Sequence, residues 1–286
     1  MQYWIFPVIA ALVCGLASLL RLNRRGLMPL CLLLGGAIAF IGAKVFYVLL
    51  MAHQELPWYG MSAFTRMKPE AFCFTAGAAC GCLGVALASR LQLKGSAPDT
   101  LDSFAPGIAL AICILRLGEC CFGSLGYGTQ AEGFFATAPF AVANSYGEWY
   151  YAIYRLEAFF ALICAALFLK KSRFPAQQFS RVAFFLAMSQ ILAENLRKRG
   201  MLYGFVHAEQ LVCAVILLAI MAWLCRKART WLPMPILTVL LGAVVGIEFL
   251  RQRSGIALFS RYGYILMVLD LAVMGVLYFR TEKRVQ

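Results

Sequence analysis

Residues 103–123 read SFAPGIALAICILRLGECCFG, an apolar run that ends with Arg116 and Glu119 in its last two turns. A helix needs about 20 mostly apolar residues to cross the hydrocarbon core of a bilayer. A charged side chain at that depth costs roughly 2.5–3.5 kcal/mol on insertion scales. Because the two charged residues are three apart, they share one face of a helix and can pair. An ion pair at this depth predicts a functional site.

The composition of the chain is typical of polytopic membrane proteins. Of its 286 residues, 62% are hydrophobic and only 14% are charged. A soluble domain of this length has no use for so much apolar surface. The net charge of +13 is carried in short clusters between apolar spans, as in the loops of membrane proteins. We therefore expect a bilayer as the partner of this surface, and no nucleic acid.

The 11 cysteines do not form the pattern of a disulfide framework. Most lie within apolar spans, where cysteine behaves as a small hydrophobic residue. No paired CxxC motifs with metal spacing occur, so neither a metal ion nor another cofactor is expected. Cys120 and Cys121 are the exception because they adjoin the charged pair. Both packing and thiol chemistry remain open for them.

Apolar runs of about 20 residues predict nine membrane spans and hence an all-α fold. Residues 1–228 are expected to form a seven-helix membrane domain, and residues 229–286 a C-terminal pair of transmembrane helices. The predicted spans lie near 3–20, 28–51, 71–92, 103–123, 150–169, 181–196, 207–225, 232–250 and 262–280.

The basic residues predict that the N-terminus lies outside and the C-terminus in the cytoplasm. With this orientation the inner segments hold 15 lysines and arginines and the outer segments hold 8. Cytoplasmic loops normally carry such an excess. The first span lacks a cleavage site and is followed by Arg21, Arg24 and Arg25, so we expect an uncleaved anchor. The outer clusters 197–199 and 251–253 depart from the rule.

Two further segments have an expected structural role. Gly77 and Gly81 form a GxxxG pattern in the third span, and small residues at this spacing let helix backbones approach closely. The segment 124–149 has no lysine or arginine and is rich in aromatic residues, which favours an interfacial belt or a lid. Its aromatic residues are Tyr127, Phe134, Phe135, Phe140, Tyr146 and Trp149.

Polar residues of the spans gather, in this orientation, at the outer leaflet. Lys44, Arg116 and Arg197 suit the phosphate of an anionic lipid, since guanidinium binds phosphate through paired hydrogen bonds and ammonium binds it as a point charge. Asp270, in the middle of the last span, is an outlier with no evident partner. The other polar residues at this level are Glu119, Tyr154, Arg155, Glu157, Gln190, Glu194, His207, Glu209, Gln210 and Glu248.

The pattern resembles the prolipoprotein diacylglyceryl transferases, bacterial inner-membrane enzymes, from about residue 3 to about residue 225. The family signature GRxGNFxNxExxG appears as LRLGECCFGSLGYG, which keeps Arg116, Gly118 and, with a small shift, Gly128. The family motif SFHGGLxG appears as FTAGAACG, which keeps Gly77 and Gly81.

Shorter matches follow the same order along the chain. The motif GGRxxYVLF appears as GAKVFYVLL, and QLYE appears as YRLE. The motif RxxxExxR appears as QILAENLR, GQxLS appears as EQLVC, and a fit anchored on NRRG covers the HWYG motif. The residues that these matches single out are Lys44, Glu157, Glu194, Arg197, Gln210 and Tyr3.

The chain also departs from the family pattern. Ala76 stands at the position of the family's histidine, and Glu119 stands at that of its signature asparagine. Phe122, Ser124 and Gln190 replace a second asparagine, the signature glutamate and the first arginine of the sixth-span motif. The last two spans lie beyond the family's usual seven.

The resemblance implies transfer of diacylglyceryl from phosphatidylglycerol to the lipobox cysteine of a preprolipoprotein. A thiolate attacks the glycerol carbon that bears the phosphate, and glycerol phosphate leaves. The resemblance assigns Arg116, Arg197 and Lys44 to the phosphate, and Glu194 and Glu157 to orienting those cations. The rest of the expected substrate site is Gln210, Gly118, Gly128 and Tyr3.

The base that takes the thiol proton is the open question, because Ala76 cannot serve. Glu119 is the expected replacement, since a carboxylate in lipid binds a proton more readily than one in water. If Glu119 stays paired with Arg116, it is instead a poor base. Three alternatives to the family reaction remain: a non-catalytic phospholipid-binding paralogue, a related transferase with another acceptor, and a transporter, for which we find no repeat halves.

Overall fold

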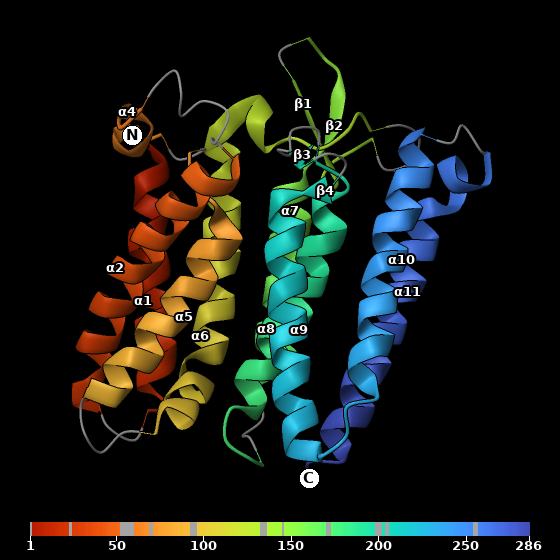
Figure 1. Ribbon diagram of the computed structural model, residues 1–286. Helices are drawn as coiled ribbons and strands as arrows, with labels where there is room; N and C mark the ends of the chain where they lie inside the picture. The colour runs from red at the N-terminus through yellow and green to blue at the C-terminus, as the bar shows by residue number, and fades with distance from the viewer. Residues whose placement is uncertain are drawn as a thin grey trace. The chain divides into compact units, whose positions relative to one another are not determined.

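A computed structural model describes residues 2–22, 25–51, 60–68, 71–91, 96–131, 136–144, 146–169, 173–197, 202–203, 206–253 and 257–286. The fold is all-α and polytopic, as predicted (Figure 1). Each of the nine predicted spans coincides with a helix in these ranges. Phe134 and Phe135 of the predicted aromatic segment lie outside the described residues.

Six helical segments are long and apolar enough to cross a membrane within the described part of the chain. The remaining predicted spans correspond to α1, which is apolar but only 15 residues long, to α7, which also has 15 residues, and to α8. The six segments are Met28–Leu50, Phe74–Leu91, Ala97–Phe122, Ala208–Ala228, Pro233–Leu250 and Tyr262–Lys283.

Short 3₁₀, π and β elements occur between the long helices. The elements in chain order are η1 (Gln2–Trp4), α1 (Ile5–Leu19), η2 (Arg25–Leu27), α2 (Met28–Phe46), η3 (Tyr47–Met51), α4 (Ser62–Thr65), α5 (Phe74–Leu91), α6 (Ala97–Gly118), η4 (Glu119–Gly126), β1 (Ala141–Ala143), β2 (Trp149–Tyr151), α7 (Ile153–Leu167), α8 (Gln177–Glu194), β3 (Leu202–Tyr203), β4 (Val206–His207), α9 (Ala208–Ala228), α10 (Pro233–Arg253) and α11 (Ala257–Lys283).

The chain divides into two compact units. Unit 1 comprises Met1–Leu186 and Leu196–Met201, and unit 2 comprises Ala187–Asn195 and Leu202–Gln286. The division therefore falls within α8. The boundary predicted after residue 228 lies inside unit 2, because α9 packs on both α10 and α11.

In unit 1, α2 and α5 pack at close range through small residues, as the GxxxG pattern predicts. A Cβ atom added to Gly77 would lie 2.7 Å from the Cβ of Ala43, and one added to Gly84 would lie 2.7 Å from the carbonyl oxygen of Leu34. Such positions admit only glycine while the two backbones keep this separation. The small residues thus set the distance between α2 and α5.

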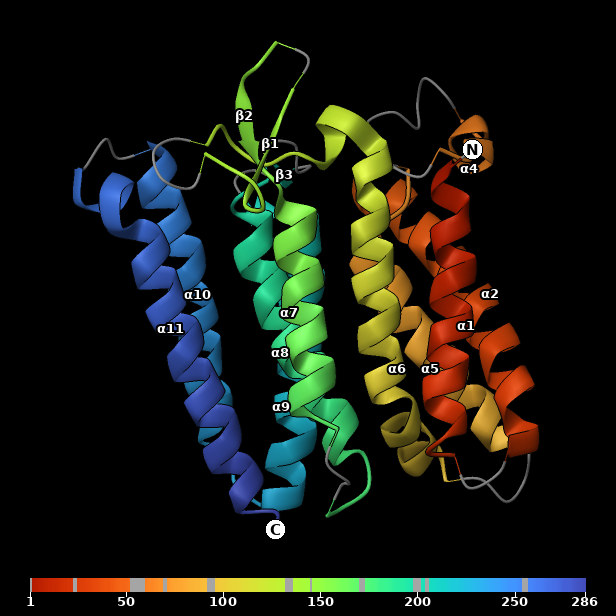
Figure 2. The ribbon, with the colours of Figure 1, turned by 180° about the vertical axis from the view of Figure 1, so that it is seen from behind.

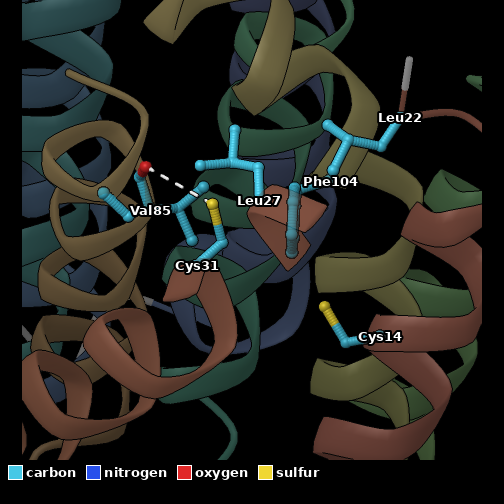
Figure 3. Close-up of a cluster of buried hydrophobic side chains, with 7 residues drawn as sticks. Cys14, Leu22, Leu27, Cys31, Val85 and Phe104 are labelled. Atoms are coloured by element: carbon cyan, nitrogen blue, oxygen red, sulfur yellow. Dashed lines mark hydrogen bonds between the residues drawn. The ribbon is translucent and has the colours of Figure 1, made fainter. Parts of the chain in front are cut away.

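An apolar cluster joins α1, α2, α5 and α6 (Figure 3). Phe104 of α6 is 1% exposed and packs with Leu27 and with Cys31, whose thiol lies 4.0 Å from the carbonyl oxygen of Val85. Cys31 therefore behaves as the small hydrophobic residue that the sequence predicts. Figures 1 and 2 show these four helices side by side within unit 1.

The first turns of α8 pack on α6 and α7. Ala105 and Ala109 of α6 meet Ala165 of α7 and Val182 of α8 in a second apolar cluster. Asp102 Oδ1 accepts a hydrogen bond of 2.8 Å from the backbone N–H of Phe179, so this buried carboxylate satisfies a free donor in the first turn of α8.

A short hairpin follows η4 in unit 1. Strands β1 and β2 are antiparallel, with Ala141 opposite Tyr151, and the hairpin lies at the same end of unit 1 as the start of α1 (Figure 1). Phe140 and Tyr146 of this aromatic segment are exposed.

Unit 2 is built on α9, α10 and α11. Leu217 and Met221 of α9, Leu237 of α10 and Met274 of α11 are fully buried in it. At the start of α9, the side chain of Gln210 accepts a 3.0 Å hydrogen bond from the backbone N–H of His207, which satisfies a donor at the helix N-terminus.

Replacement of Gly77 by valine should destabilise the α2–α5 contact. The new side chain has no space beside Ala43, and overpacking of this kind costs about 1–3 kcal/mol. Thermal unfolding of the purified protein in detergent measures the loss. Gly36→Val on α2 is the control, because an added Cβ at Gly36 meets nothing within 4 Å. Equal losses for the two variants would contradict this packing.

Candidate functional site

The end of α6 places two charged residues where the sequence predicts an ion pair. Arg116 Nη1 donates to Glu119 Oε1, three residues further along the chain. The helix ends at Gly118, and Glu119 begins η4. A Cβ atom at Gly118 would lie 2.7 Å from the ring carbon Cγ of Phe6 in α1. Gly118 thus allows α1 to pack closely against the turn that carries the pair.

Two further charges from distant parts of unit 1 complete a cluster of four. Glu157 of α7 pairs through Oε2 with Arg116 Nε at 3.3 Å and also accepts from Arg197 Nη2. Arg197, which follows α8, donates through Nη2 to Glu119 Oε2 at 3.1 Å. Each arginine therefore contacts both glutamates. We call Arg116, Glu119, Glu157 and Arg197 the four-charge cluster.

The four-charge cluster is buried and electrically balanced. The exposed fractions of the Arg116, Glu119 and Glu157 side chains are 3%, 6% and 4%, whereas that of Arg197 is 15%. Two positive and two negative charges cancel, so this group is not the net basic site that the sequence led us to expect. An anionic ligand must compete with the carboxylates for the guanidinium groups, and Arg197 is the most accessible of the four.

Backbone packing holds Arg197 in place through Gly128. The two residues face each other in an antiparallel bridge, and Thr129 N–H donates to the carbonyl oxygen of Leu196 at 3.0 Å. A Cβ atom at Gly128 would lie 2.7 Å from that same carbonyl oxygen. Gly128, which the resemblance places in the substrate site, therefore acts on the cluster by positioning the backbone beside Arg197.

Aromatic side chains line the cluster. The guanidinium carbon of Arg116 lies 3.8 Å from the ring centroid of Phe74, a contact that sequence reasoning missed. The sequence offered one indication of this contact, because Phe74 is the first residue of the FTAGAACG motif. Tyr3, in η1, is the aromatic residue expected at this site. Its ring centroid lies 4.8 Å from that of Phe122 in η4, the element that begins with Glu119.

Lys44 has a different set of partners from those expected. Its ammonium group donates to the carbonyl oxygens of Arg66 at 2.6 Å and Ala71 at 3.2 Å, and it lies 4.9 Å from the ring centroid of Phe72. Among the described residues, no carboxylate pairs with it. Lys44 thus secures the segment that leads into α5 and Phe74, and its predicted contact with phosphate stays a prediction.

The two glutamates of the four-charge cluster differ in how their oxygens are used. Both oxygens of Glu119 accept from guanidinium groups. Glu157 uses Oε2 for both arginines, and its Oε1 is buried with no hydrogen-bond partner among the described residues. Buried acceptors normally have a donor, so the free lone pairs of Oε1 point to a chemical role.

The remaining predicted site residues belong to unit 2. Gln190 Nε2 donates to Glu194 Oε1 at 2.8 Å. Gln210 Nε2 lies 3.3 Å from Glu248 Oε2, and His207 Nε2 lies 3.7 Å from Glu248 Oε1. Glu248 is 1% exposed, so this carboxylate of α10 gives the C-terminal helix pair a polar attachment to α9.

Three other residues noted in the sequence have clear positions. Cys120 and Cys121 are both exposed free thiols, with sulfur atoms 4.0 Å apart. Ala76 is buried in the α2–α5 contact region of α5. Among the described residues, no group of three or more His, Cys, Asp or Glu side chains is placed to hold a metal ion.

Compared with known proteins, the chain matches no family model and no curated protein sequence. The resemblance to diacylglyceryl transferases therefore rests on the ordered motifs alone.

Proposed function

We propose that the protein is a bacterial inner-membrane enzyme that moves the diacylglyceryl group of phosphatidylglycerol to the lipobox cysteine of a preprolipoprotein. The observation that carries this proposal is the four-charge cluster. Its members come from three separate motif matches, those at residues 116–128, 154–157 and 190–197, and their side chains meet at one place. Residues from three separate stretches of the chain thus form one buried group, as a binding site requires.

The cluster supplies what the reaction needs for its leaving group. Arginine forms paired hydrogen bonds with phosphate oxygens, and Arg116 and Arg197 lie close enough to share two carboxylates. In a water-poor setting, fixed donors stabilise charge that develops on a leaving phosphate. Tyr3 adds a phenol that packs against Phe122 of η4. The roles that the resemblance assigns to Lys44, Glu194 and Gln210 stay predictions.

A non-catalytic phospholipid-binding protein is the second candidate function. The charge balance of the cluster favours it, because the guanidinium groups already have anionic partners and such a network also serves to hold membrane helices together. Ala76, buried where the family has a histidine, points the same way. Transfer of radiolabelled diacylglycerol to a lipobox peptide by the purified protein separates the two candidates.

Phosphatidylglycerol should bind through Arg197. Arg197→Gln removes one charged hydrogen bond to phosphate, worth about 1.5–3 kcal/mol, so affinity should fall about 10- to 100-fold. Native mass spectrometry measures the affinity for phosphatidylglycerol and compares it with that for phosphatidylethanolamine. Arg155→Gln is the control, because Arg155 lies outside the four-charge cluster and donates instead to the carbonyl oxygen of Pro139 at 3.1 Å, just before β1. Equal losses, or no preference between the lipids, would remove the phosphate site from the proposal.

The proposed location also requires a defined orientation. Reporter fusions after residues 94, 228 and 286 should report the cytoplasm, and a fusion after residue 140 should report the outside, because the basic residues divide 15 to 8 between the two sides. A cytoplasmic position for residue 140 would place the four-charge cluster on the wrong side for a lipoprotein precursor.

A further inference from the structure

The structure distinguishes two carboxylates that the sequence leaves equivalent. Glu119 and Glu157 are similarly buried and contact the same two arginines. Each carboxylate oxygen of Glu119 pairs with one guanidinium group, Oε1 with that of Arg116 and Oε2 with that of Arg197. Glu157 holds both guanidiniums with Oε2 alone, and its buried Oε1 has no donor among the described residues. The two side chains therefore differ in their capacity to take a proton.

We infer that Glu157 is the proton acceptor for the acceptor thiol, through its Oε1 atom, an inference that rests on the proposed transfer reaction. It assigns to α7 the role that Ala76 cannot fill and that sequence reasoning gave to Glu119. A general base must present a free lone pair within hydrogen-bond reach of the proton it removes. Within the four-charge cluster, Glu157 Oε1 meets the first requirement.

The surroundings of Glu157 suit this role. The charged groups that face it are Arg116 of α6, Glu119 at the start of η4, and Arg197 after α8. The two arginines hold the carboxylate in one orientation through Oε2, as the second partner of a catalytic base usually does. They are also the groups proposed to bind the phosphate. One cluster therefore serves both the acceptor thiol and the leaving phosphate.

The step balances as a single displacement. The thiol proton passes to Glu157 Oε1, and the sulfur forms a bond to the glycerol carbon of the diacylglyceryl group. The bond from that carbon to the phosphate oxygen breaks, and its electron pair leaves with glycerol phosphate. The proton on Glu157 then passes to the departing phosphate or to water, which restores the carboxylate.

A matched pair of isosteric variants tests the assignment. Glu157→Gln and Glu119→Gln each remove one negative charge from the same cluster. Loss of a general base lowers rates about 10²- to 10⁴-fold, so Glu157→Gln should lose transfer by at least about 100-fold. Glu119→Gln also disturbs the two arginines, but its loss should not recover at high pH because the base is intact. A thiol has an ordinary pKa near 8.5. Raising the pH above that value should therefore restore transfer in Glu157→Gln, because the thiolate then forms without a base.

Infrared spectroscopy supplies a readout that does not depend on transfer. A protonated carboxyl band that appears as pH falls should vanish in Glu157→Gln and persist in Glu119→Gln. Loss of the band or of transfer in Glu119→Gln alone would overturn the assignment, and so would equal losses in both variants without recovery at high pH. Wild-type protein that shows the Glu157 band but no transfer would instead contradict the proposed function and leave Glu157 as a proton-binding site.

Discussion

The buried network of ion pairs is the constraint on which the rest of unit 1 depends. Its members are Arg116, Glu119, Glu157 and Arg197. A single charge left without a partner in a buried site costs about 3–5 kcal/mol, so none of the four can move away alone. They belong to α6, η4, α7 and the segment after α8. The cluster therefore fixes how these elements meet at one end of unit 1.

Small residues let the backbone come close enough for those charges to meet. Gly118 admits Phe6 beside the end of α6, and Gly128 admits the Leu196 carbonyl beside Arg197. Gly77 admits Ala43 of α2 beside α5, the helix that also places Phe74 against Arg116. Glycines from separate parts of the sequence thus allow close packing in unit 1, two of them directly beside the four-charge cluster.

The sequence predicts local and periodic features of this protein well. Apolar length places a helix at each of the nine predicted spans, the GxxxG spacing predicts that a helix backbone approaches α5 closely, and the three-residue spacing predicts the Arg116–Glu119 pair. Only the resemblance groups Glu157 and Arg197 with that pair. Residue spacing does not predict which distant charges join it, because these two residues reach it only through tertiary packing. For the same reason the partners of Lys44, which are loop carbonyls, and the different use of oxygens in Glu119 and Glu157 become visible only in three dimensions.

A double-mutant cycle between Arg116 and Glu119 tests most directly whether the four charges act as one balanced unit. The unfolding of Arg116→Met, Glu119→Gln and the double variant would be measured in detergent. Residues in one ion-pair network typically couple by about 0.5–3 kcal/mol. The double variant should therefore be more stable than the sum of the single losses predicts, since removing both charges restores the balance. Losses that simply add would show that the two charges are independent, and would contradict the account.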